Sequence, residues 1–118
     1  MQGEHREHGM ATAELALIIP AVLLVLALCL SGLGLAIDQV RCVDGARVAA
    51  RAASRGEPDQ KVAEQARQGA PEGSSVTLTR RDEYVLVVVT APARRFALPG
   101  LPAAQATATA PLEPVVDR

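Results

Sequence analysis

The sequence Gly9-Met10-Ala11-Thr12-Ala13-Glu14 stands directly before an uncharged, largely apolar run, Leu15–Ile37. As a helix, these 23 residues span about 34 Å, slightly more than the roughly 30 Å hydrocarbon core of a bilayer. The apolar region of a secretory signal peptide is only about 7–15 residues long, so we expect a retained transmembrane helix over residues 10–37. Gly34-Leu35-Ala36 resembles a small-x-small cleavage site, which leaves open a secreted product released after Ala36.

The charge balance and the aromatic content limit the partners that this chain can bind. The 118 residues include 12 basic and 13 acidic side chains, so no strong net field attracts nucleic acid. Tyr84 and Phe96 are the only aromatic residues, which argues against base stacking and against an aromatic-lined ligand pocket. We therefore expect no nucleic-acid partner and no small-molecule substrate.

The residue types used in catalysis and metal binding form no recognisable constellation. His5-x-x-His8 has a spacing that can bind a metal, but both histidines lie within residues 1–9, ahead of the apolar run. The sequence contains no Gly-rich phosphate loop, no CxxC and no nucleophile elbow. We expect no enzymatic activity, no metal site and no cofactor.

Cys29 and Cys42 are too far apart to bridge each other on one continuous helix. Their separation of 13 residues corresponds to about 20 Å along the axis, whereas a disulfide requires Cα atoms within about 7 Å. We interpret both as small apolar side chains, with Cys42 the only candidate for an intermolecular bond.

Features within and around the apolar run bear on packing and orientation. Pro20 removes one backbone donor and can bend the helix axis. Ala27-x-x-x-Ser31 and Gly32-x-x-x-Ala36 would let another helix approach closely, although an alanine-rich chain also produces such spacings by composition alone. Arg6 precedes the run, whereas four arginines follow it, namely Arg41, Arg47, Arg51 and Arg55. The positive-inside rule taken alone therefore places the C-terminal part in the cytoplasm.

Beyond Ile37 the helical period continues to Arg55. Charged residues recur at steps of three or four on one face, which is either a solvated stripe or a packing surface; they are Arg41, Asp44, Arg47, Arg51 and Arg55. The opposite face is expected to consist of small residues, namely Val40, Val43, Ala46, Ala50 and Ala53. Gly56 and Pro58 then stop the helix. Asp59 is expected to cap a second short helix that ends near Gln68.

After the loop at residues 69–75 the period changes from helix to strand. Val76–Thr79 and Gln105–Ala110 alternate like edge strands, and Arg81-Asp82-Glu83 is expected to form a turn. Tyr84–Ala91 contains Val85-Leu86-Val87-Val88-Val89, which is apolar on both faces and predicts a central strand covered on both sides. The fold class predicted is α+β, with a long N-terminal helix that extends into a small head containing a second helix and a three-stranded antiparallel sheet.

The N-terminal residues resemble those of TadE-like proteins, which are pseudopilins or minor pilins of the tight-adherence (Flp-type) branch of the type IV pilus machinery. The resemblance rests mainly on Gly9 and the following Met10-Ala11-Thr12-Ala13-Glu14-Leu15-Ala16-Leu17-Ile18-Ile19-Pro20. The stretch at residues 44–53 also looks like the small-and-Arg helix that follows the membrane span in that family. The Ala-Thr repeat and Glu113-Pro114 are similar to its C-terminal pattern.

By this resemblance, residues 1–9 are a leader that prepilin peptidase removes after Gly9, leaving Met10 as the new N-terminus. Glu14 then becomes the fifth residue, where a pilin carboxylate is thought to pair with the freed α-amino group of a neighbouring subunit. An ammonium partner would offset the roughly 2.5–3.5 kcal/mol that an unpaired carboxylate costs in lipid. The resemblance implies a cell-membrane location, a single-pass topology and an extracytoplasmic head over residues 38–118, with prepilin peptidase, other pilin or pseudopilin subunits and the membrane as partners.

Two other interpretations remain open. In the first, the chain would be an unprocessed single-pass accessory or regulatory subunit whose head binds another membrane protein. In the second, it would be a secreted binding module released after Ala36. Without a pairing role, Glu14 would only mark the membrane boundary. The mature N-terminus separates the three, because it would be Met10, Met1 or Ile37.

Overall fold

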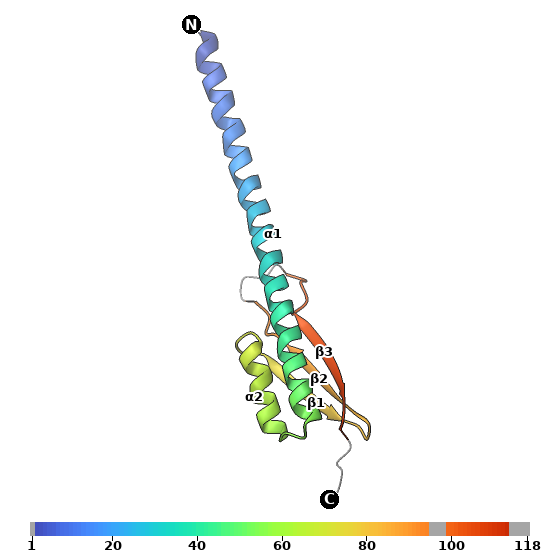
Figure 1. Cartoon of the computed structure of the whole chain (residues 1–118). Coiled ribbons are helices and arrows are strands. Elements are labelled where there is room, and N and C mark those ends of the chain that lie inside the picture. Colours follow the sequence, from blue (N-terminus) through green and yellow to red (C-terminus); the bar gives the residue numbers. More distant parts are fainter. Residues whose placement is uncertain (1, 95–98, 114–118) are drawn as a thin grey trace, which may run out of the picture. The chain divides into compact units, whose positions relative to one another are not determined.

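The computed structural model of the chain describes residues 2–94 and 99–113, with side chains described from residue 7 onward. Its elements follow the order α1 (Gln2–Ser54), α2 (Asp59–Gly69), β1 (Ser75–Arg80), β2 (Tyr84–Thr90) and β3 (Gln105–Pro111) (Figure 1). The α+β prediction is confirmed: a long apolar N-terminal helix is followed by a short helix and a three-stranded antiparallel sheet. The chain divides into two compact units, residues 1–33 and residues 34–118, and α1 contributes to both.

The first unit is a single helical stretch without tertiary cover from its own residues. Its described side chains from Glu7 to Leu30 are all exposed, including the large apolar ones. An 18-residue window of this helix has a mean hydropathy of 2.7 and no buried residue, and the helix is long and apolar enough to cross a membrane. Exposure of so much apolar surface to water is unfavourable, which indicates a membrane location for this part of the chain. The helix continues through Pro20.

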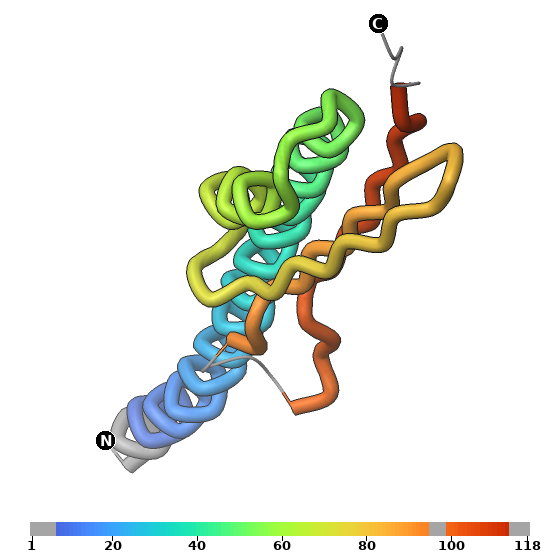
Figure 2. The backbone as a smooth tube through the Cα atoms, turned by 90° about the horizontal axis from the view of Figure 1, so that it is seen from below, coloured from blue at the N-terminus to red at the C-terminus, as the bar shows by residue number. Residues whose placement is uncertain are grey.

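The second unit, which we call the head, is built around β2. The strand order is β1-β2-β3, and both neighbours pair antiparallel to β2 (Figure 1). Figure 2 shows the C-terminal part of α1 and the whole of α2 on the same side of this sheet. Between helices and sheet lies a core of small side chains, the largest of them valines; its fully buried members include Cys42, Ala46, Ala49, Val62, Ala66, Val85, Val87 and Val89.

Two predicted packing faces are corrected by the structure. Val85, Val87 and Val89 are buried, but Leu86 and Val88 on the opposite face of β2 are half-buried, so the strand is central without being covered on both sides. β-Branched residues suit any pleated strand, and an apolar run therefore does not require two covered faces. Val40 is 68% exposed and lies outside the buried face of α1.

Two predicted roles of single residues are also wrong. Asp59 does not cap α2, because Pro58 occupies the N-cap position without a side-chain hydrogen bond. The Asp59 carboxylate instead accepts a hydrogen bond of 2.7 Å from Arg80 Nε, which draws it away from the helix end. Cys42 is fully buried, and its Sγ lies 3.8 Å from the Ala104 carbonyl oxygen, so it is not available to a second chain. Burial also raises the pKa of the Cys42 thiol. Cys29 is the exposed cysteine.

Candidate functional site

The three residues predicted to act in processing and assembly lie on one exposed stretch of α1. Gly9, Met10 and Glu14 are all exposed, and a Cβ added to Gly9 would meet no atom within 4 Å. Glu14 stands five positions after Gly9 on the helix, which corresponds to about 7.5 Å along the axis. The structure places these residues close together in a position that an enzyme or another subunit can reach.

The Glu14 carboxylate has no hydrogen bond or ion pair among the residues whose side chains are described. Nearby, the Thr12 hydroxyl donates to the His8 carbonyl oxygen at 2.9 Å, so that polar group is satisfied within the helix. Leu15–Ile37 contains no charge that could serve Glu14 from the C-terminal side. A compensating cation for Glu14 in a bilayer therefore cannot come from these 23 residues.

The apolar helix surface that follows Glu14 is available for contact with lipid or with another helix. A shallow groove runs along it, lined by Ile18, Ala21, Val22, Val25, Leu26 and Cys29. Ser31 belongs to one of the predicted small-residue pairs, but its hydroxyl donates to the Ala27 carbonyl oxygen at 2.8 Å. That hydroxyl is therefore used inside its own helix, and the Ala27–Ser31 pair can offer another helix only its small size.

At the C-terminal end of the apolar run, an ion pair within the head joins the segment after β2 to α1. Arg94 donates from Nε and Nη2 to the Asp38 carboxylate at 2.7 and 2.8 Å, and from Nη2 to the Gly34 carbonyl oxygen at 3.1 Å. Asp38 is only 6% exposed. The hydrogen bond from Arg94 lowers the pKa of Asp38, against the opposing effect of burial. No local pattern marks this pair, because its members are 56 residues apart.

This ion pair predicts acid sensitivity of the head. Because the folded-state pKa of Asp38 lies below the unfolded value of about 3.9, the pair adds stability above that value and loses it as the pH falls through the folded pKa. We expect Asp38→Asn to be less stable than the wild type at neutral pH, with a difference that shrinks in acid. Thermal unfolding of the full chain in detergent, followed by Tyr84 fluorescence between pH 7 and pH 2, measures this. Equal stability of wild type and Asp38→Asn at neutral pH would contradict it, and the exposed Asp82→Asn is the control.

The Gln39 side chain of α1 bonds to the backbone at one end of β3, an edge strand of the sheet. Gln39 Nε2 donates to the Gln105 carbonyl oxygen at 2.8 Å, and the Gln105 amide donates to Gln39 Oε1 at 3.2 Å. The Ala91 amide donates to the Ala104 carbonyl oxygen, and the Leu112 amide donates to the Glu83 carbonyl oxygen. With the β2–β3 register, these two bonds determine which residues of β3 direct their backbone groups at β2. The backbone groups of Gln105, Thr107, Thr109 and Pro111 accordingly point away from β2. The Gln39 amide group thus takes the place of a neighbouring strand at one end of this edge.

At the other end of this edge, Pro111 has no amide hydrogen to offer. Exposed edges of uncharged strands invite pairing with other chains. We expect Gln39→Ala to speed hydrogen exchange of the Gln105 amide and to increase self-association of the chain in detergent, measured by light scattering after gel filtration. The exposed Gln60→Ala should change neither quantity. An unchanged Gln105 exchange rate would show that the Gln39 contact does not protect the edge.

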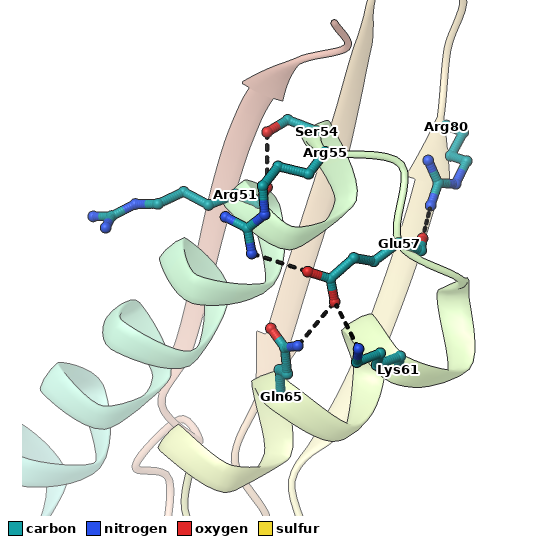
Figure 3. Close-up of polar contacts among 7 residues, drawn as sticks. All are labelled: Arg51, Ser54, Arg55, Glu57, Lys61, Gln65 and Arg80. Atoms are coloured by element: carbon teal, nitrogen blue, oxygen red, sulfur yellow. Dashed lines mark hydrogen bonds and ion pairs between the residues drawn. The ribbon is translucent and has the colours of Figure 1, made fainter. Parts of the chain in front are cut away.

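A separate polar cluster joins α1, α2 and β1 at the opposite end of the head (Figure 3). Glu57 follows Gly56, whose φ of 83° suits glycine. The Glu57 carboxylate accepts hydrogen bonds from Arg55 Nη2 at 3.0 Å and Gln65 Nε2 at 2.9 Å, and Arg80 Nη2 donates to the Glu57 carbonyl oxygen at 3.1 Å. The hydrogen bond from Arg55 lowers the pKa of Glu57. These contacts are internal to the head, and we interpret the cluster as structural.

The predicted arginine face divides into two kinds of residue. Arg41 donates to the Ala70 carbonyl oxygen at 3.2 Å, and Arg55 is paired with Glu57, so both support the head. Arg47 and Arg51 remain exposed on α1. The described residues hold no group of three or more His, Cys, Asp or Glu side chains placed to bind a metal. His8 is exposed, and the side chain of His5 lies outside the described residues.

Comparison with known proteins gives one informative similarity. A protein of Mycobacterium tuberculosis (strain H37Rv) named "Apoptosis inhibitor Rv3655c" is 45% identical over 78 residues, which make up 66% of this chain and 62% of that protein. The chain therefore spans less than two thirds of the length of this relative. No family profile matches the chain, and no solved structure matches it.

Proposed function

We propose that this chain is a minor pilin or pseudopilin of a tight-adherence type IV pilus or a related secretion system. In this proposal, prepilin peptidase cleaves after Gly9 and the processed chain assembles through its N-terminal helix. The observation that carries the proposal is the exposed Glu14, which has no partner among the described side chains, at the entrance of an uncharged membrane-length run. The resemblance of residues 9–20 to TadE-like proteins supports it.

Cleavage and assembly are chemically linked in this proposal. Removal of residues 1–9 would create a new α-amino group at Met10, which is positively charged near neutral pH. The Glu14 carboxylate of a neighbouring subunit needs such a cation, since an unpaired carboxylate in lipid costs on the order of 2.5–3.5 kcal/mol. A subunit cut at Gly9 would both supply the amine and keep the helix, whereas an uncut subunit could not supply it at this position.

The part of α1 from Ile37 onward offers a second contact surface for neighbouring subunits. Ile37, Val40 and Val48 are 49%, 68% and 39% exposed although the same helix buries its alanines against the sheet. Arg47 and Arg51 lie exposed on this stretch as well. Apolar and cationic side chains on one solvent-facing helix suit packing against another helix that carries carboxylates.

An unprocessed accessory or regulatory subunit of another membrane protein is the alternative within the same location. The residues ahead of the cut favour it, because Gln2–His8 mixes acidic and basic side chains, whereas pilin leaders are usually basic. The arginines that follow the apolar run also favour a cytoplasmic head by the positive-inside rule. The alternative keeps the membrane helix and removes both the cleavage and the role of Glu14.

The relative's name supplies a second candidate function, the inhibition of apoptosis. It is favoured by the 45% identity over 78 residues. A direct test adds the purified full chain, reconstituted in vesicles, to cultured cells treated with an apoptosis inducer and measures caspase activity. A reduction relative to empty vesicles would support this function, and an unchanged caspase activity would count against it.

The processing step is tested by Gly9→Val in cells that contain a prepilin peptidase. The added side chain has open space, so the helix can accommodate it while the peptidase loses the glycine at its cut site. We expect wild-type chain to be shortened and Gly9→Val to keep its full mass, as read by mass spectrometry of the intact protein. Gly32→Val is the matched control, since a Cβ there also meets nothing within 4 Å, and it should be processed normally. Shortening of Gly9→Val at the same position would contradict glycine-dependent cleavage.

A further inference from the structure

The connection between β2 and β3 is fixed against the last turn of the apolar run. It begins after Ala91, whose amide donates to the Ala104 carbonyl oxygen at 2.8 Å, so the two ends of the connection are paired. Within it, Arg94 bonds to Asp38 and to the carbonyl oxygen of Gly34. A Cβ on Gly34 would lie 2.9 Å from Arg94 Cζ, so glycine makes room for the guanidinium. The part of the connection up to Arg94 is thereby held beside Gly34 and Asp38.

The length of the apolar run gives the depth of this contact. A helix that enters the hydrocarbon at Leu15 reaches Gly34 after 20 residues, a rise of about 30 Å, which equals the thickness of the hydrocarbon core. A tilted helix would leave Gly34 deeper still. The guanidinium of Arg94 therefore lies at the level where hydrocarbon gives way to lipid headgroups. Asp38 partly neutralises its charge there, and Arg94 remains 48% exposed.

The described residues of the connection have the composition of a membrane-surface segment. Beside Arg94 stand seven uncharged residues that are all exposed, namely Pro92, Ala93, Pro99, Gly100, Leu101, Pro102 and Ala103. Leu101 is a large apolar side chain with 42% exposure. Prolines lack an amide hydrogen, so the segment has fewer backbone donors that require water. These features favour a position at the lipid–water boundary over a position in bulk water.

We propose that residues 92–94 and 99–103 of the β2–β3 connection rest in the phospholipid headgroup layer as a second membrane contact. Leu101 reaches the outer end of the acyl chains, and the exposed side of the Arg94 guanidinium faces lipid phosphate. The inference rests on the membrane span of the proposed function and is independent of cleavage after Gly9.

The test uses a single tryptophan, because the chain contains none. Full-length Leu101→Trp is reconstituted in phosphatidylcholine–phosphatidylglycerol vesicles whose acyl chains carry bromine near the headgroup. We expect Trp emission at shorter wavelength than in water and strong quenching by these bromines. Gln60→Trp, exposed in the first turn of α2, is the control and should emit as in water without quenching. If Leu101→Trp does not fold, Pro102→Trp provides the same measurement from the neighbouring exposed residue.

Flotation of the vesicles separates failure of this inference from failure of the span. Chain that floats with the vesicles while Leu101→Trp or Pro102→Trp emits like Gln60→Trp would overturn the headgroup contact and leave the span intact. Chain that does not float would overturn both. Processing at Gly9, read from the mass of the protein in cells, is unaffected by either result.

Discussion

If the proposed pilin function holds, replacement of Glu14 by alanine removes the chain from assembled appendages while its membrane insertion and its head fold persist. The carboxylate is exposed, it has no partner among the described side chains, and it precedes 23 residues without charge. Loss of its attraction for a neighbour's α-amino group should lower incorporation on the order of tenfold or more, since each 1.4 kcal/mol is about tenfold. The measurement is the ratio of chain in sheared surface filaments to chain in membranes, by quantitative mass spectrometry.

Glu64→Ala is the matched control for this substitution. Glu64 is exposed on α2, so its removal makes the same chemical change in the head. It should leave incorporation unchanged, and Glu14→Asp should restore part of the loss because the charge is retained. Normal incorporation of Glu14→Ala would remove the pairing mechanism from the proposal.

The second large effect is expected at Gly45, where α1 and α2 touch. A Cβ at Gly45 would lie 2.6 Å from the Ala66 carbonyl oxygen and 3.3 Å from the Ala70 amide nitrogen. A Cβ at Gly69 would likewise lie 3.1 Å from the Gly45 Cα. These neighbours are backbone atoms, so no side-chain rotation can relieve the overlap and α2 would have to move. Overpacking of this kind costs about 1–3 kcal/mol.

We therefore expect Gly45→Ala to lower the melting temperature of the head by roughly 5–20 °C, given about 4–8 °C per kcal/mol for a domain of this size. The measurement is thermal unfolding of the full chain in detergent, followed by Tyr84 fluorescence. Gly32→Ala is the control, because a Cβ at Gly32 meets no atom within 4 Å and alanine favours a helix. A Gly45→Ala melting temperature at or above that of the wild type would show that the two helices do not pack this closely.

The elements of the fold could be predicted from local patterns. Gly56 and Pro58 stop α1, and the observed strands agree with the alternating and β-branched runs to within one residue at each end for β1 and β3. Local patterns could not show which face of each strand the helices cover. Val88 looks like Val87 in the sequence, and only the position of the helices makes one half-buried and the other buried.

In the candidate site, too, local features could be predicted from the sequence and long-range contacts could not. Gly9, Met10 and Glu14 could be selected from sequence because their signal is local: a glycine and a lone carboxylate beside an uncharged run. The contacts of Arg94 with Asp38 and of Gln39 with Gln105 join residues 56 and 66 positions apart, and no periodicity marks them. Cys42 was misjudged for a related reason, since burial depends on the sheet that packs against its helix.

The central claim is that the chain is cut after Gly9 and keeps its membrane helix, and the mature N-terminus tests it most directly. Mass spectrometry of the N-terminal peptide, from native cells and from cells lacking prepilin peptidase, identifies that terminus. We expect Met10 in the native cells and Met1 in the cells without the peptidase. Met1 in both would contradict the processing, and Ile37 would show that the membrane helix is removed.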